Sequence, residues 1–345
     1  MAEKLKILVT GASGFIGSFL CEEGLRQGFE VWAGMRATSS RRWLQHEWLQ
    51  FVTLDLTQPE VLRSQLADFK ARHGAWDIVI HAGGATKCLD PADFDRHNYD
   101  CTVHLVEALA ELEMKPQLFV YVSSLSVLGP IREDYTALRS DDVPQPNTAY
   151  GRSKLKSEQY LLGLEQALPT VIFRPTGVYG PRERDYFLQV KTIKQHIDFA
   201  VGFQPQRITF VYVQDLVRAI YLAVAKAVGG EAQAICGKIY HVSDGQTYDS
   251  RQFGALVKRF LGVSWVAHVT APLWVLRTMC AVSDWWSRLT RRVSTLNNDK
   301  YRILSQRNWA CDITPARRDL GFEPEWPLER GTQATMEWYL KEHWL

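Results

Sequence analysis

A glycine-rich turn directly after an apolar run is the feature that most constrains this chain. Leu5–Thr10 is predicted to be a buried strand, and it leads into Thr10-Gly-Ala-Ser-Gly-Phe-Ile-Gly17. In such a turn Gly11 permits the bend, Gly14 lets the backbone approach a phosphate, and Gly17 lets the next helix pack on the strand. The free N–H groups at the helix start attract a pyrophosphate. This placement favours a dinucleotide-binding unit over a glycine turn that binds nothing.

Apolar runs and helical patterns alternate through the first half of the chain. This alternation predicts an α/β protein with a Rossmann-type, doubly wound parallel sheet. The expected strands after the first are Glu30–Met35, Phe51–Leu54, Ile78–His81, Phe119–Ser123 and Val171–Arg174, and the expected helices are Phe15–Gln27, Pro59–His73, Asp93–Leu112 and Tyr150–Leu168.

The alternation weakens after residue 180, where Pro, Gly and aromatic residues become denser. We therefore expect residues 1–180 to form the Rossmann domain. Residues 205–245 are expected to return to it, through a strand at Ile208–Val213 and a helix at Asp215–Ala227. Residues 181–204 and 246–345 are assigned to a smaller C-terminal substrate lobe.

Composition excludes several classes of function. The chain carries 40 basic and 38 acidic side chains in 345 residues, so no strong field directs it to nucleic acid. Its six cysteines form no CxxC pair, so we expect no metal site and reduced thiols in the cytoplasm. No signal peptide is recognisable. The apolar stretch Ala271–Val282 is interrupted by Arg277 and is shorter than the roughly 20 residues of a transmembrane helix.

Residues after the second and third strands bear on the choice of cofactor. An acidic residue after the second strand usually binds the ribose of NAD, whereas this chain has Arg36, with Ser39 and Arg41 close behind. A guanidinium suits the 2′-phosphate of NADP, so NADP is expected and NAD is the alternative. Asp55, at the end of the third strand, is either an acceptor for adenine or a cap for the following helix.

A second constellation carries acid–base chemistry. Tyr150-Gly-Arg-Ser-Lys154 places a phenol and an ammonium on one face of a helix. The lysine cation would lower the pKa of the tyrosine, which could then exchange a proton with a substrate oxygen. Ser124, after the strand Phe119–Ser123, could hold the same oxygen. A tyrosine–lysine pair alone is a weak signal, but its order after a glycine turn and a Ser-Ser pair makes it specific.

Together these residues resemble the extended short-chain dehydrogenase/reductase family, the NAD-dependent epimerase/dehydratase-like group. The similarity covers roughly residues 5–245. It includes Ile80-His-Ala-Gly-Gly84, where Gly83 replaces the usual alanine, and Asn98, followed by Cys101 where the family has glycine. It continues through Arg174-Pro-Thr-Gly-Val-Tyr-Gly-Pro181 and Val211-Tyr-Val-Gln-Asp215.

The resemblance implies the site residues. The catalytic set is Ser124, Tyr150 and Lys154. The implied cofactor-binding residues are Gly11, Ser13, Gly14, Phe15, Ile16, Gly17, Arg36, Asp55, Leu56, His81, Ala82, Gly83, Asn98, Ser123, Tyr150, Lys154, Arg174, Pro175, Thr176 and Val178.

The implied reaction is hydride transfer between a nicotinamide and a ketone or secondary alcohol. Gly177 stands where nucleotide-sugar enzymes usually carry asparagine, and Ile208-Thr209 replaces their arginine–aspartate pair. Both departures weaken the assignment to a nucleotide-sugar substrate. The C-terminal lobe resembles the sterol-dehydrogenase and dihydroflavonol-reductase-like branch of the family, which implies an apolar, sterol- or flavonoid-like substrate. The alternatives are a nucleotide-sugar epimerase or dehydratase with tightly bound NAD, and a cofactor-binding subunit without catalysis.

Three further expectations concern the lobe and the assembly. Trp265, Trp274, Trp285 and Trp286 lie among leucines and valines, which suits an apolar substrate pocket or the lobe's own core. The segment from Trp274 to Arg291 and Arg292 is expected to be a buried helix, with peripheral contact to a membrane surface as the alternative. The resemblance also implies a homodimer paired through residues 98–112 and 150–168.

Overall fold

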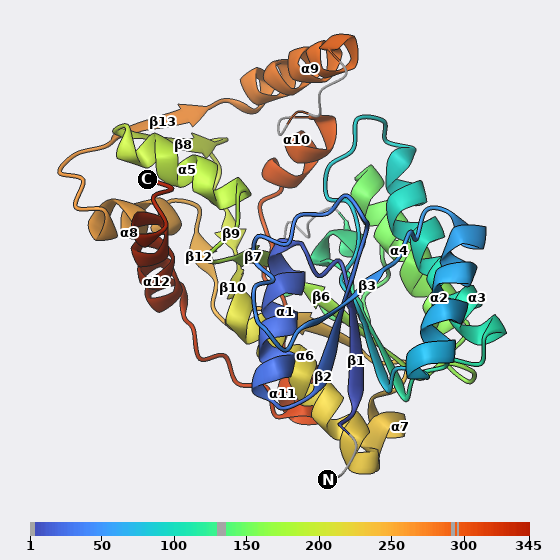
Figure 1. Ribbon diagram of the computed structural model, residues 1–345. Helices are drawn as coiled ribbons and strands as arrows, with labels where there is room; N and C mark the ends of the chain where they lie inside the picture. The colour runs from blue at the N-terminus through green and yellow to red at the C-terminus, as the bar shows by residue number, and fades with distance from the viewer. Residues whose placement is uncertain (1–3, 130–135, 291–293, 295–296) are drawn as a thin grey trace.

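The computed structural model describes residues 4–129, 136–290, 294 and 297–345. Its centre is a seven-stranded sheet in the order β11-β6-β5-β4-β1-β2-β3, in which every neighbouring pair is parallel (Figure 1). The order reverses between β1 and β4, so the carboxyl ends of these two strands border the crevice where such sheets bind ligands. The strands are β1 (Lys6–Thr10), β2 (Glu30–Met35), β3 (Gln50–Thr53), β4 (Ile78–His81), β5 (Leu118–Val122), β6 (Thr170–Pro175) and β11 (Ile239–Val242).

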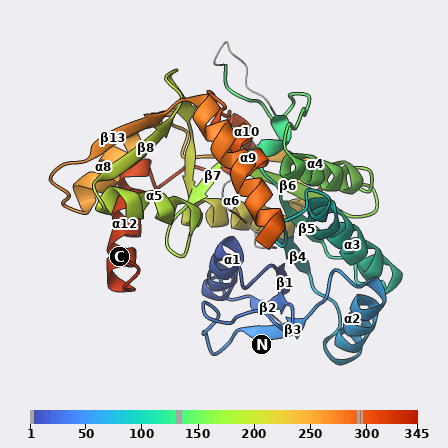
Figure 2. The same ribbon diagram turned by 90° about the horizontal axis from the view of Figure 1, so that it is seen from above.

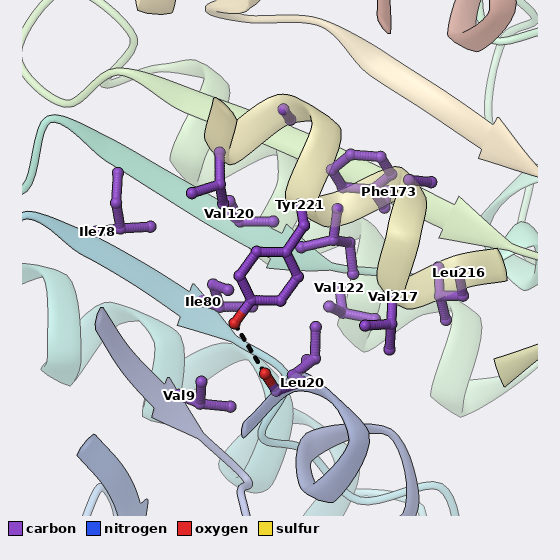
Figure 3. Close-up of a cluster of buried hydrophobic side chains, with 14 of the residues drawn as sticks. Val9, Leu20, Ile78, Ile80, Val120, Val122, Phe173, Leu216, Val217 and Tyr221 are labelled. Atoms are coloured by element: carbon purple, nitrogen blue, oxygen red, sulfur yellow. Dashed lines mark hydrogen bonds between the residues drawn. The ribbon is translucent and has the colours of Figure 1, made fainter. Parts of the chain in front are cut away.

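Helices cover both faces of the sheet because its strands are apolar on both sides. One face packs against α1 (Phe15–Arg26), α6 (Val213–Lys226) and α11 (Thr314–Leu320). The other packs against α2 (Pro59–His73), α3 (Cys101–Glu111) and α4 (Ala149–Leu162). Figure 3 shows the first of these cores, where the buried Tyr221 hydroxyl donates a 2.8 Å hydrogen bond to the Leu20 carbonyl. The predicted doubly wound sheet is confirmed.

A smaller lobe lies at one end of the sheet and has its own aromatic core. Tyr179, Phe210, Phe253, Met336 and Tyr339 are all buried in it. Its helices are α5 (Asp185–Lys194), α8 (Gln252–Phe260), α9 (Leu273–Thr290), α10 (Asn298–Leu304) and α12 (Leu328–Lys341). Its strands form three pairs: β7 (Gly177–Tyr179) with β10 (Phe210–Tyr212), β8 (Ile197–Val201) with β13 (Ala267–Ala271), and β9 (Arg207–Ile208) with β12 (Tyr248–Asp249).

Some predicted elements differ from the structure. The helix expected from Asp93 begins as a π-helix at Asp95–Asp100, and the helix expected to reach Leu168 ends at Leu162. The strand expected at Ile208–Val213 is divided at Thr209, whose hydroxyl donates to the Trp309 carbonyl at 2.6 Å. Two short pieces follow α6: the π-helix Ala227–Glu231 and α7 (Ala232–Ile235).

The predicted assignment of residues 246–345 to the lobe needs one change. Ile313, Ala316, Leu320 and Phe322 are buried in the core between α1, α6 and the sheet. The chain therefore returns to the Rossmann side a second time before it forms α12.

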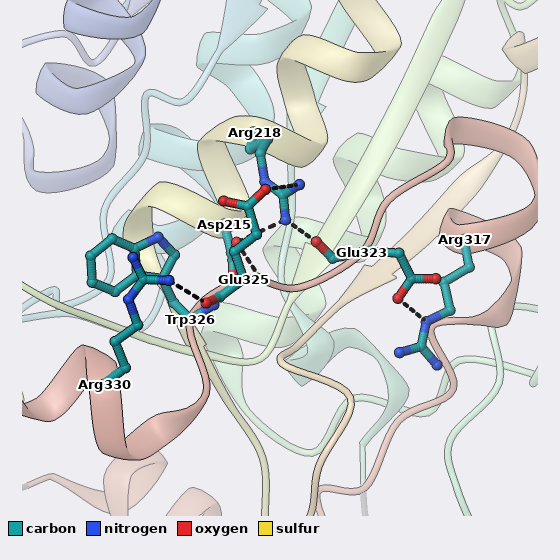
Figure 4. Close-up of polar contacts among 7 residues, drawn as sticks. All are labelled: Asp215, Arg218, Arg317, Glu323, Glu325, Trp326 and Arg330. Carbon is teal, nitrogen blue, oxygen red and sulfur yellow. Dashed lines mark hydrogen bonds and ion pairs between the residues drawn. The ribbon is translucent and has the colours of Figure 1, made fainter.

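A buried carboxylate fastens the connection that follows this returning segment to α6 (Figure 4). Asp215, at the start of α6, accepts from the backbone N–H groups of Glu325 and Trp326 at 3.1 and 2.9 Å and pairs with Arg218 at 3.1 Å. Asp215 thus holds the connection that leads into α12, because the N–H groups of Glu325 and Trp326 would lose their acceptor if the carboxylate were removed.

The predicted burial of the α9 segment is wrong. Helix α9 lies on the outside of the molecule, at the upper edge in Figure 1 and in front of the other elements in Figure 2. Trp274, Trp285 and Trp286 are exposed, as is Trp265 before β13. These tryptophans therefore line neither an enclosed pocket nor the lobe's core. Arg291 and Arg292 of the predicted segment lie outside the described residues. In the described part of the chain, no helix is both long and apolar enough to span a membrane.

Candidate active site

The glycine turn lies at the carboxyl end of β1 and leaves the start of α1 without side-chain cover. Gly11 has a φ of +69°, a conformation that favours glycine. A Cβ at Gly17 would lie 2.1 Å from the Gly11 carbonyl oxygen, and one at Gly11 would lie 2.7 Å from Gly83. The predicted neighbours Ser13, Phe15 and Ile16 lie in the turn and the first turn of α1. The residues present therefore fit a pyrophosphate held by backbone N–H groups.

Behind the turn, a buried histidine joins two strands and a helix. His81 Nδ1 lies 2.6 Å from the Thr10 hydroxyl, and His81 Nε2 lies 3.1 Å from the Thr102 hydroxyl. Burial, with a smaller effect of the Lys154 charge, lowers the pKa of His81 to about 3, so the ring is neutral. His81 thus fixes the strand end that carries Ala82 and Gly83 against the glycine turn. Sequence reasoning did not identify Thr10 and Thr102 as site residues.

The segment after β4 continues from the glycine turn to α4. Asn98, in the π-helix, accepts from the Ala85 N–H at 2.7 Å and donates to the Ser153 hydroxyl at 2.9 Å. A Cβ at Gly84 would lie 3.3 Å from Lys154 Nζ, so the backbone here passes directly beside the lysine. A bare strip of backbone therefore links the glycine turn to the predicted catalytic helix.

Helix α4 places the tyrosine and lysine in its first two turns. The Thr148 hydroxyl caps it by accepting from the Gly151 N–H at 3.0 Å. Lys154 Nζ donates to the Val122 carbonyl at 2.9 Å and lies 4.8 Å from the centre of the Tyr121 ring. Ser124 follows β5 and begins the short 3₁₀-helix Leu125–Leu128, which packs on α4.

The pKa values of this pair are governed by burial. Burial raises the pKa of Tyr150 to about 12, against a smaller lowering from hydrogen bonding with Ser124. Burial lowers the pKa of Lys154 to about 8, against the opposing charge of Glu158. The expected lowering of the Tyr150 pKa by Lys154 is absent from the protein alone, where desolvation of the phenol is the dominant effect.

A buried ion pair lies beneath the site. Glu158, one turn beyond Lys154, pairs with Arg174 of β6 at 2.6 Å and accepts from the Ser123 hydroxyl at 2.5 Å. Ser123 and Arg174 are both predicted to contact the cofactor. In the structure both bind the same residue, Glu158. Pro175 ends β6, the Thr176 hydroxyl lies 2.7 Å from the Thr209 hydroxyl, and Val178 pairs with Val211 in the adjoining strands.

The residues predicted for the adenosine half lie at the ends of β2 and β3. Asp55 accepts from the Thr57 hydroxyl at 2.6 Å, and hydrogen bonding to Thr57 is the largest cause that lowers its pKa, with Arg36 contributing by its charge. Gln58, not Asp55, is the residue before the first turn of α2, so the capping alternative is excluded. Arg36 is exposed, and the Leu56 carbonyl lies 2.8 Å from His104 Nδ1.

An aromatic residue occupies the place beside Gly177. A Cβ at Gly177 would lie 2.2 Å from the Tyr186 hydroxyl, which comes from α5. The asparagine usual in nucleotide-sugar enzymes would therefore collide with Tyr186. On the other side of the site, the Phe94 ring meets the Tyr150 ring edge-on, with their centres 5.9 Å apart.

Other features of the described residues do not coincide with this site. Two shallow hollows are lined by Phe203, Leu273 and Trp274 in one case and by Trp43, Leu44 and Arg182 in the other. Neither includes Ser124, Tyr150 or Lys154. No group of three or more His, Cys, Asp and Glu side chains in the described part of the chain is placed to hold a metal ion.

A doubly wound sheet with a bare glycine turn at its strand-order reversal defines a Rossmann-type dinucleotide-binding protein. Residues 7–242 match the NAD dependent epimerase/dehydratase family, and the chain belongs to this family of enzymes. The sequence-based assignment to this family is confirmed.

Comparison with known proteins shows similarity to more than one activity. A 3-beta-hydroxysteroid dehydrogenase of Mycolicibacterium neoaurum is 26% identical over 343 residues, covering 97% of this chain and 91% of the relative. An uncharacterized UDP-glucose epimerase of Bacillus subtilis is 28% identical over 246 residues, covering 64% and 73%. The structure of UDP-glucose 4-epimerase from Thermotoga maritima has a TM-score of 0.77 at 21% identity, covering 98% of this chain and 100% of that one. The last comparison establishes the shared fold.

Proposed function

We propose that the protein transfers a hydride between a nicotinamide dinucleotide and a ketone or secondary alcohol. The observation that carries this proposal is the continuous strip from the glycine turn, past Gly83 and Gly84, to Lys154 and the first turn of α4. A dinucleotide bound by its pyrophosphate at the turn would reach Tyr150 with its other end. A protein with a purely structural role would not need the glycine turn and the Tyr150–Lys154 pair to lie along one strip of backbone.

The dinucleotide would be held by backbone at Gly11, Gly14 and Gly17 and along Ala82 and Gly83, with Asp55 and Leu56 at the adenine. We propose NADP as the cofactor because Arg36, exposed at the end of β2, offers a guanidinium where NAD-binding chains offer a carboxylate. When bound, the nicotinamide would supply or accept the hydride, and its oxidised form would add positive charge to the site.

The chain's own residues would manage the proton. Tyr150, with its pKa near 12, is protonated at neutral pH and can donate its proton to a carbonyl oxygen. Lys154 lies one helical turn away and would stabilise the phenolate that remains. Ser124 would orient the substrate oxygen by a hydrogen bond.

We propose an apolar, sterol- or flavonoid-like substrate. Tyr186 takes the space beside Gly177 that a diphosphate-binding asparagine would need, and Phe94 packs against the catalytic tyrosine. The similarity to a 3-beta-hydroxysteroid dehydrogenase over nearly the whole chain also supports an apolar substrate.

The alternative is a nucleotide-sugar epimerase or dehydratase that retains its cofactor, and it draws on the similarity to the epimerase relative. Such an enzyme would carry tightly bound NAD on purification and would need no added cofactor. A cofactor-binding subunit without catalysis would bind NADPH but show no turnover with any carbonyl compound.

The test is Tyr150→Phe, assayed by NADPH oxidation with a panel of apolar ketones and nucleotide sugars. Loss of the acid should lower kcat by about 10²- to 10⁴-fold while the Kd for NADPH stays within about twofold of the parent. Tyr160→Phe is the matched control, because Tyr160 lies on the same helix with its ring against Tyr99. Near-parental turnover of Tyr150→Phe would show that another group carries the proton.

Two properties of the whole protein complete the proposal. We propose a homodimer through the partly exposed faces of α3 and α4, to be measured by sedimentation equilibrium. A cytoplasmic setting is supported by the cysteines, all six of which are free thiols.

A further inference from the structure

Helix α9 carries most of its large apolar side chains on the side that faces away from the protein. Trp274, Val282, Trp285 and Leu289 retain 70%, 64%, 63% and 64% of their accessible surface. These residues share one face of the helix because they are spaced at three- to four-residue multiples. Leu276, Cys280 and Ser287, on the opposite face, are buried, and the helix packs on α10. The amphipathic pattern is therefore turned outward, the reverse of a helix that covers a core.

The exposed surface extends beyond this stripe. Trp286 and Met279 are exposed at 59% and 49% on its edge, and Phe203, after β8, is exposed at 74%. A hollow of about 300 Å³ lined by Phe203, Leu273 and Trp274 joins the two elements. We call Phe203 together with six of the exposed apolar residues of the helix the outer surface of α9. A contiguous apolar surface of this kind marks an interaction site. Its six helix residues are Trp274, Met279, Val282, Trp285, Trp286 and Leu289.

The charges on α9 are distributed unevenly around this surface. The helix contains Arg277, Arg288 and one acidic residue, Asp284. Asp284 is turned toward α10, where its carboxylate accepts from the Asn298 N–H at 3.1 Å, whereas Arg277 is exposed. The described part of α9 thus presents tryptophan and arginine outward and no carboxylate.

We propose that the outer surface of α9 docks the protein on an anionic lipid bilayer, with the helix lying in the plane of the interface. Tryptophan is enriched at the level of lipid headgroups, and arginine beside an apolar face favours anionic lipids. Spanning is not implied, because no described helix can cross a membrane. The helix lies along the upper edge of the molecule (Figure 1), as insertion of one face requires.

The docked helix would lie close to the chemistry. Helix α9 packs on α10, and Asp299 of α10 accepts from the backbone N–H of Tyr150 at 3.2 Å. If the proposed function is correct, a substrate that partitions into the bilayer would then be delivered near its reaction site. The docking itself does not depend on that function, since it is measured without substrate.

The experiment is co-sedimentation of the full chain with vesicles of phosphatidylcholine alone or mixed with phosphatidylglycerol. The parent should bind the mixed vesicles, and raised salt should weaken the binding. The double variant Trp285→Gln/Trp286→Gln should bind about tenfold or more weakly. The matched control is Trp48→Gln, because Trp48 is similarly exposed but lies in the loop before β3, and it should bind as the parent does.

Three results would overturn the proposal. One is the absence of parent binding to either vesicle; another is equal binding by the double variant. The third is a dimer that forms without lipid and is lost in the double variant, which would assign the surface to a second copy of the chain. Melting curves should match among the proteins, because the substituted side chains are exposed.

Discussion

Single residues at the end of β2 are expected to decide which dinucleotide binds. Arg36 is exposed there and contributes to the lowered pKa of Asp55 through its charge. The nearby Arg41 guanidinium lies 4.0 Å over the Phe51 ring, so it is held against the protein. Arg36 is therefore the arginine better placed to meet a 2′-phosphate, because guanidinium groups bind phosphate through paired hydrogen bonds.

Arg36→Ala should raise the Kd for NADPH by about 10- to 100-fold and change the Kd for NADH by less than about threefold. Fluorescence titration of the two reduced cofactors measures both constants. Arg42→Ala is the control, since the Arg42 guanidinium lies 4.5 Å over the Trp43 ring in the same loop. An equal loss for NADH and NADPH would mean that Arg36 supports the loop without reading the phosphate.

Contacts between site residues that are close in sequence could be predicted from the sequence. Contacts between residues far apart in sequence could not. The glycine turn and the Tyr150–Lys154 pair are each local, so their spacing alone indicated their geometry. Glu158 and Asp299 gave no comparable signal. Asp299 meets Ala149 and Tyr150 across about 150 residues of sequence, and only the packed lobe brings them together.

At the level of elements, the start of α4 receives a second cap from the lobe. The Asp299 carboxylate of α10 accepts from the N–H groups of Ala149 and Tyr150 at 2.8 and 3.2 Å. A negative charge at a helix start is stabilising, and these donors have no partner within their own helix. The helix that carries Tyr150 is thus positioned by a residue of the lobe.

Asp299→Ala should lower the free energy of unfolding by about 1–2 kcal/mol and lower kcat by up to about tenfold, because the first turn of α4 loses its anchor. Asp299→Asn keeps a hydrogen-bond acceptor, so its free energy of unfolding and its kcat should lie between those of Asp299→Ala and the parent. Urea unfolding and turnover measure the two effects. Asp284→Asn removes the charge of another capping carboxylate, on α9, and should leave kcat unchanged. Normal kcat in Asp299→Ala would contradict the positioning role.

The sequence pattern predicted most sheet strands to within one residue because buried parallel strands are nearly continuous apolar runs. Helix α9 shows where such reasoning stops. Periodicity tells which of its side chains share a face, and it does not tell which face the protein covers. The outward orientation of the tryptophans depends on the packing of α10 against α9.

Over the whole molecule, buried histidines make stability depend on pH. Burial lowers the pKa of His241 from 6.5 to about 4 and that of His81 from 6.5 to about 3. The unfolded chain therefore binds more protons than the folded chain below pH 6.5. The contribution of the two neutral histidines to the free energy of unfolding is fully present above pH 6.5. It is lost as the pH falls toward the pKa values of the folded protein.

The free energy of unfolding should fall by about 2 kcal/mol per buried histidine between pH 6.5 and about pH 5. His241→Asn should flatten that dependence by one histidine's share, whatever its effect on stability at neutral pH. Urea titrations at several pH values measure the slope. His46→Asn, at an exposed loop position, should keep the parental slope. An unchanged slope in His241→Asn would show that other groups control acid unfolding.

The double return of the chain to the sheet limits how this enzyme can exchange parts with its relatives. Residues 313–322 belong to the sheet's core, and Asp215 ties the following segment to α6, so the lobe is assembled from separated stretches of sequence. A single crossover between two genes would separate parts of the lobe from the residues of the Rossmann side that bind them. New substrate preferences should therefore arise by point changes within the lobe more readily than by swapping it as a cassette.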